Sequence, residues 1–192
     1  MVRSLLGTRH SRQPHRISIR VRELPLLFNP MDPSPLPEKD LDTETADYIA
    51  SWADEFPIRE PVALLFLVEH APAGTDLQHV VESAARTYFT SRADFKRLEF
   101  RRLMREGQTS LVIGVVFLAA CVVLAQWLRT PAVTLHNVFR ESLLVAGWVA
   151  MWRPLQIYLY EWWPIRRRRR LYDKLAAAPI TVKIGTGGAA SR

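Results

Sequence analysis

The sequence predicts an α/β soluble domain, in the order strand, helix, strand, helix, joined to an α-helical transmembrane hairpin. Two observations predict this class. In the first half, apolar residues alternate with a period of two or recur at helical spacing, as in a small packed domain. The second half holds two long apolar runs, residues 110–128 and 142–165, with a short polar segment between them.

The first apolar run, from Ser110 to Leu128, contains no charged residue. As an α-helix, its roughly nineteen residues would extend about 28 Å, close to the hydrocarbon thickness of a bilayer. The second run, from Ser142 to Ile165, is also long enough to cross but carries Arg153 and Glu161. We therefore expect the chain to cross a membrane twice.

Basic residues flank this predicted hairpin. The formal net charge is +7, and arginines cluster before the first run and directly after the second, at 166–170. The segment between the runs, residues 129–140, has only its two terminal arginines. The positive-inside rule therefore puts both termini in the cytoplasm. This distribution favours a bilayer with anionic headgroups over nucleic acid as the partner of the basic residues.

The single cysteine, Cys121, lies inside the first run, so an intramolecular disulfide is excluded. The N-terminus lacks an apolar stretch of signal-peptide length. Residues 1–15 are basic and predict a disordered arm.

A strand is predicted over residues 16–24, where Ile17, Ile19 and Val21 alternate with polar residues. Five prolines between 25 and 41 indicate an extended connection. A helix should follow from Thr43 to Phe56, with Asp42 as N-cap. Its apolar face is expected to comprise Tyr48, Ile49, Trp52 and Phe56.

Residues 61–69 form a continuous apolar run, which predicts a strand buried on both faces. Thr75 and Gln78 match a capping box, and a long helix should begin there and run on toward the membrane. Its apolar stripe is Leu77, Val80, Val81, Ala84 and Tyr88.

Two strands joined through a helix are most simply parallel. A two-stranded sheet is marginal by itself, so either a third strand, for which 180–184 is a candidate, or neighbouring subunits should complete it. We favour self-association. The predicted parts are an arm (1–15), a cytoplasmic α/β domain (16–106), the hairpin (107–165) and a basic juxtamembrane segment with a flexible tail (166–192).

Arg153-Pro154 is the least expected pair, because Arg153 lies near the middle of the second run. One interpretation is an ion or substrate contact at a broken helix. The other is that the membrane segment ends near Trp152, with an amphipathic helix over 155–177 along the interface. Glu161 is too distant for direct contact with Arg153 in a straight α-helix, so another subunit is a possible source of the partner.

Two further groups suit a membrane boundary. Trp127, Trp162 and Trp163 are placed as interfacial aromatics, although packing against a partner helix explains them equally well. The basic run is interpreted as an anchor to lipid headgroups, with a specific protein or nucleic-acid contact as the alternative. It comprises Arg166, Arg167, Arg168, Arg169 and Arg170.

The sequence offers no catalytic, cofactor-binding or metal-binding residues that stand out. Glu69, His70, His79 and Glu82 would form a metal site only if the strand end faced the helix, and their spacing does not require it. There is no glycine-rich phosphate loop and no nucleophile elbow. We therefore expect a protein that is not an enzyme and binds no cofactor.

The segments Gly147-Trp-Val-Ala-Met-Trp-Arg-Pro154 and Glu161-Trp-Trp-Pro-Ile-Arg166 resemble those of uncharacterised bacterial two-span inner-membrane proteins. The resemblance implies an integral membrane protein of the bacterial inner membrane. It implies no activity, ligand or functional residue.

The function we expect is that of an integral membrane scaffold or an accessory subunit of a larger assembly, either a homo-oligomer or a complex with other membrane subunits. Acidic residues between 38 and 60 would contact a basic partner or simply be solvated. The alternative is an oligomeric pore or transporter subunit that uses Arg153 and Glu161.

Overall fold

The computed structural model describes residues 14–35, 39–70, 76–127 and 134–185. Residues 1–13 of the predicted arm, Thr75 and residues 186–192 lie outside these residues. The predicted arm was too long by its last residue, because His15 begins a strand and its backbone N–H donates to the carbonyl of Pro61. The chain divides into two compact units, residues 1–93 with 170–192 and residues 94–169. The fold is mostly helical, with a small parallel sheet and one long apolar helix.

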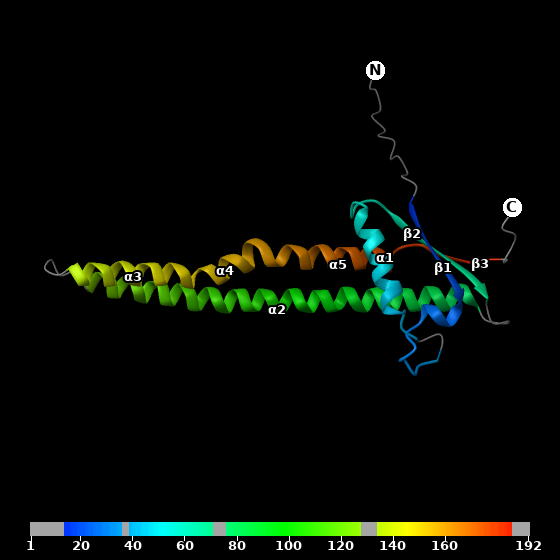
Figure 1. Ribbon diagram of the computed structural model, residues 1–192, viewed down its shortest axis with the longest axis horizontal. Helices are drawn as coiled ribbons and strands as arrows, with labels where there is room; N and C mark the ends of the chain where they lie inside the picture. The colour runs from blue at the N-terminus through cyan, green and yellow to red at the C-terminus, as the bar shows by residue number, and fades with distance from the viewer. Residues whose placement is uncertain (1–13, 36–38, 71–75, 128–133, 186–192) are drawn as a thin grey trace, which may run out of the picture. The chain divides into compact units, whose positions relative to one another are not determined.

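The first unit is built on a three-stranded parallel sheet of order β1-β2-β3 (Figure 1). The strands are β1 (His15–Glu23), β2 (Val62–His70) and β3 (Ile180–Ile184). The structure thus confirms the two parallel strands and the candidate third strand. In register, Ile17 pairs with Leu64, which in turn pairs with Ile180.

One face of the sheet is buried and the other is not. Ile17, Leu64 and Phe66 lie in the core, whereas Leu65 and Leu67 on the opposite face of β2 are only half-buried. The prediction that β2 is buried on both faces was therefore wrong. Residues 61–69 are apolar on both faces because β2 is the central strand. Its outward side chains are therefore partly shielded by β1 and β3 on either side.

Helix α1 (Thr43–Glu55) follows the 3-10 helix η1 (Leu24–Leu27) and an irregular connection. The side chain of Asp42 accepts a hydrogen bond from the backbone N–H of Thr45, at 3.0 Å, which confirms the predicted N-cap. Within the connection, the backbone N–H groups of Asp40 and then Ser34 donate to Asp32, and these bonds lower the pKa of the Asp32 carboxyl.

The predicted apolar face of α1 is only partly correct. Ile49 is fully buried, but Tyr48 and Trp52 are 48% and 43% exposed. The core face is instead formed with the small residues Ala46 and Ala53. These alanines let the helix approach closely, and a pattern search that weights large apolar side chains overlooks them.

Helix α2 (Leu77–Trp127) is continuous through Gly107 and extends the predicted long helix into the first apolar run. Its first part lies in unit 1, where the predicted stripe is buried. At its start, Asp76 Oδ1 accepts a hydrogen bond from the backbone N–H of His79 (3.2 Å). The cap is therefore Asp76, and the predicted capping-box role of Gln78 was wrong.

Gln78 instead binds the edge of β3. Its amide nitrogen donates to the carbonyl of Ile180, and its amide oxygen accepts from the backbone N–H of Val182, both at 2.8 Å. These are the two backbone groups that a neighbouring strand would have engaged. The side chain thus occupies one repeat of the open edge of β3.

The last part of α5 (Trp162–Ala176) completes the core of unit 1 with Leu171, Tyr172 and Leu175. The ring of Tyr172 stacks on Phe89 with 6.4 Å between centroids. Burial lowers the pKa of Lys174, whose ammonium donates to the carbonyl of Pro57 at 3.2 Å.

In unit 2, α3 (Thr134–Ala150) runs beside the second part of α2 (Figure 1). After a turn at Met151, the chain continues through α4 (Trp152–Gln156) and the π-helix η3 (Ile157–Glu161) into α5. The second apolar run is therefore not one helix over 142–165. Proline is tolerated in the first turn of a helix but not in its interior, so Pro154 requires a new helix to begin at Trp152.

Candidate functional site

The helical pair of unit 2 exposes large apolar side chains along both helices. Of the described helices, only α2 is long and apolar enough to cross a membrane, a criterion that buried core helices of soluble proteins also meet. Only 17% of its apolar segment is buried, however. α3 has 17 residues and carries Arg140 and Glu141, so it is short for a span. The exposed apolar residues are Val112, Ile113, Val115, Val116, Phe117, Val123, Leu124, Val138, Phe139, Val145, Trp148 and Val149.

Two glycines fix how α2 and α3 face each other. A Cβ added at Gly147 would lie 2.8 Å from Leu118 Cδ1 and 3.3 Å from Cys121 Cβ. One at Gly114 would lie 3.1 Å from the carbonyl oxygen of Ala150. The absence of side chains at these positions lets the two helices pack closely. The antiparallel register that results pairs residue 147 with 118–121 and residue 150 with 114.

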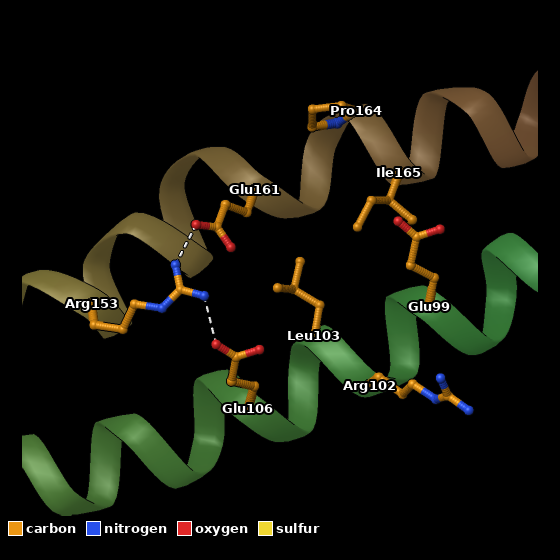
Figure 2. A pocket seen from close by; sticks show the side chains of 8 residues that line it. All are labelled: Glu99, Arg102, Leu103, Glu106, Arg153, Glu161, Pro164 and Ile165. Atoms are coloured by element: carbon orange, nitrogen blue, oxygen red, sulfur yellow. Dashed lines mark hydrogen bonds and ion pairs between the residues drawn. The ribbon is translucent and has the colours of Figure 1, made fainter.

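This register puts Arg153 opposite the end of α2's charged part. The two terminal nitrogens of its guanidinium, Nη2 and Nη1, donate to Glu106 on α2 and to Glu161 on η3, respectively, each at 2.5 Å (Figure 2). We call these three residues the arginine cluster. Glu106 precedes the charge-free run that begins at Ser110, so the cluster lies at one end of the apolar surface.

The direct Arg153–Glu161 contact contradicts the expectation that their spacing is too long. Eight residues of a straight α-helix would separate them by about 12 Å along the axis. The chain between them is not a straight α-helix, because α4 ends at Gln156 and the π-helix follows. The two long side chains reach across the remaining distance.

The cluster borders an open groove with a cavity volume of about 520 Å³. Leu103 projects from α2 into the space between the two helices (Figure 2). The groove is lined by Glu99, Arg102, Leu103, Glu106, Arg153, Glu161, Pro164 and Ile165.

The carboxylates around this groove are paired with cations. Glu99 binds Lys96 at 2.6 Å, and Glu106 and Glu161 share Arg153. The side chains of Glu106 and Arg153 are 54% and 47% exposed, so these are screened ion pairs of modest energy. Through Arg153, these ion pairs connect α2 with α4 and η3.

The residues that were predicted to lie at the membrane interface are found near the two ends of the apolar surface. Trp127 is 84% exposed at the end of α2. The indole N–H of Trp162 donates to the carbonyl of Tyr158 (2.7 Å), and Arg166 stacks over the Trp162 ring. Trp163 is exposed, as are four of the five arginines from 166 to 170, the half-buried one being Arg169.

The four residues considered for a metal do not form one site. Among the described residues, no group of three or more histidines, cysteines or carboxylates is placed to hold a metal ion. Glu82 accepts hydrogen bonds from Gln78 (3.2 Å) and Arg86 (3.0 Å), and these lower its pKa.

The sequence singled out Arg153 and Glu161 but missed Glu106. The missing signal was the helix register, because Glu106 is distant in sequence and belongs to a generally charged stretch of α2. Comparison with known proteins adds no further assignment: no family model, curated protein or solved structure matches the chain.

Proposed function

We propose that the chain is an integral membrane scaffold or accessory subunit, anchored by the second part of α2 together with α3. The observation that carries the proposal is the exposed apolar surface of these two helices. A soluble monomer rarely exposes so large a contiguous apolar surface, and a lipid environment would remove its cost. The α/β unit would then present the surfaces that bind partners.

The charged residues match the expected boundaries of such an anchor. Between Ser110 and Trp127, α2 rises about 26 Å, near the thickness of the hydrocarbon core. The arginine cluster lies at one end of this stretch, and the register puts Arg140 near the other. Long arginine side chains can reach the headgroups from such positions. We propose that both termini are cytoplasmic and that the membrane is a bacterial inner membrane.

The anchor is tested by introducing charge into the apolar surface. Val116→Arg puts a guanidinium where the wild-type side chain is 64% exposed to the proposed lipid, at a cost of about 2.5–3.5 kcal/mol. We expect it to deplete the full-length protein from alkali-washed membranes. Gln108→Arg, on the exposed charged part of α2, is the matched control and should remain membrane-bound. A wild-type chain that is a soluble monomer without detergent would refute the anchor.

The topology is tested by labelling Asn137→Cys in a Cys121→Ala background. Asn137 is exposed near the start of α3. A membrane-impermeant maleimide should reach it from the periplasm of intact cells, and labelling only after the inner membrane is opened would reverse the topology.

The pore alternative is less well supported by the geometry. Arg153 is bonded to two glutamates at one end of the apolar surface, rather than in its middle. Reconstitution in liposomes would decide between the two functions. We expect no ion flux at any protein density, whereas flux that Arg153→Ala abolishes would favour a pore.

A further inference from the structure

The outer face of the sheet in unit 1 is only partly covered. Parallel sheets are almost always covered on both faces, because their central strands carry apolar residues on each side. Here Ala63, Leu65 and Leu67 of β2 form an apolar strip that is only half-buried. The opposite face of the sheet is the covered one, because core residues of the helices pack around Leu64 and Phe66 there.

Basic residues border this strip on both sides. In register, Ser18 and Arg20 of β1 lie beside Leu65 and Leu67, and Lys183 of β3 lies on the other side of Leu67. Arg20 and Lys183 are exposed. We call this surface, with Arg16 and Thr181, the open sheet face.

The same unit carries a complementary surface on α1. Tyr48 and Trp52 are exposed neighbours on this helix, with their rings 6.0 Å apart. Exposed acidic residues surround them, and aromatic residues that protrude among charges are typical of protein interfaces. These acidic residues are Glu44, Asp47, Asp54 and Glu55.

We propose that the open sheet face binds the outer face of α1 from a second copy of this chain. The dimensions agree: three strands at about 4.8 Å spacing span about 10 Å, the diameter of one helix. Tyr48 and Trp52 would cover Leu65 and Leu67, while the flanking acids face Arg20 and Lys183. The inference rests on the proposed scaffold function, for which it names the partner.

The two surfaces are different, so the contact is heterologous. Each copy would offer its α1 to one neighbour and its sheet to another, and such contacts build a closed ring or an open row. Intramolecular binding of the same pair is excluded, because α1 uses its opposite face, with Ile49, in the core shared with the buried side of the sheet.

The test is cross-linking of full-length protein in membranes, with Cys121→Ala as background. One tagged chain carries Trp52→Cys and a differently tagged chain carries Leu67→Cys. Oxidation should produce a mixed disulfide dimer. Met31→Cys, at a position that is 88% exposed, replaces Trp52→Cys as the matched control and should give none.

Charge exchange makes the test specific. Arg20→Glu with Lys183→Glu in the Leu67→Cys chain should lower the yield of cross-linked dimer at least about tenfold, since like charges would then face each other. Adding Asp47→Lys with Glu55→Lys to the Trp52→Cys chain should restore it. A yield unaffected by these changes would overturn the proposal.

Other occupants give other results. A Leu67→Cys dimer with itself, formed in preference to the mixed dimer, would mean that sheet faces pair with each other. If anionic vesicles holding single copies protect Leu67→Cys from a soluble maleimide, lipid covers the face. Either result overturns the proposal. If the protein stays in washed membranes but gives no mixed dimer, the proposed contact is refuted and the proposed membrane anchor is not. The two proposals can therefore fail separately.

Discussion

The packing of α3 on α2 predicts that one substitution will form a disulfide with the native cysteine. A Cβ at residue 147 would lie 3.3 Å from Cys121 Cβ, just below the usual 3.5–4.5 Å between the Cβ atoms of a disulfide. A shift of a few tenths of an ångström by either helix suffices. The methyl group of Leu118, at 2.8 Å, is the distal end of a flexible side chain and can rotate away. We therefore expect Gly147→Cys to form an intramolecular disulfide with Cys121.

The assay counts free thiols with a maleimide polymer under denaturing conditions. After mild oxidation, Gly147→Cys should bind no polymer, and after reduction it should bind two. Trp148→Cys, whose wild-type side chain is 72% exposed, is the control and should keep both thiols. In the chain-entropy model, a bridge that closes the loop between residues 121 and 147 stabilises the folded state by about 3.5 kcal/mol. The described register is refuted if Trp148→Cys oxidises and Gly147→Cys does not.

Three further substitutions test local interactions. Gln78→Ala should cost about 1–2 kcal/mol and speed amide hydrogen exchange at the edge of β3, whereas Gln78→Glu should retain part of the protection by keeping one acceptor. Asp42→Ala should lower the free energy of unfolding by about 1 kcal/mol in thermal melts, and Asp42→Asn should recover most of it. The lowered pKa of Asp32 means that its two backbone hydrogen bonds stabilise the fold above the normal pKa of an aspartate and are lost as pH falls through the lowered value. Asp32→Asn should therefore reduce the loss of stability measured between neutral and acidic pH, and an unchanged acid profile would contradict this assignment.

Local patterns predicted much of the α/β unit. The alternation at Ile17 and Ile19 defined β1, and Asp42 marked the start of α1. Both signals depend on neighbours in the sequence, which a single chain displays directly. The parallel pairing of β1 and β2 also followed, because two strands joined through a helix are most simply parallel.

What the sequence could not supply was the pairing of distant segments. The contact of Glu106 with Arg153 depends on the register of α2 and α3, which Gly114 and Gly147 set through close approach. Glycine within an apolar run carries no sign of which partner it admits. The outward position of Trp52 was missed because Ala46 and Ala53, though small, form the buried side of α1.

The amide of Gln78 makes the two borders of the sheet unequal. Where β3 would have accepted another strand, two of its backbone groups are already engaged by a side chain from α2. A foreign segment would have to displace that amide before adding to this border, so misassembly by strand addition meets a barrier here. One glutamine side chain therefore protects part of this border against the addition of a further strand.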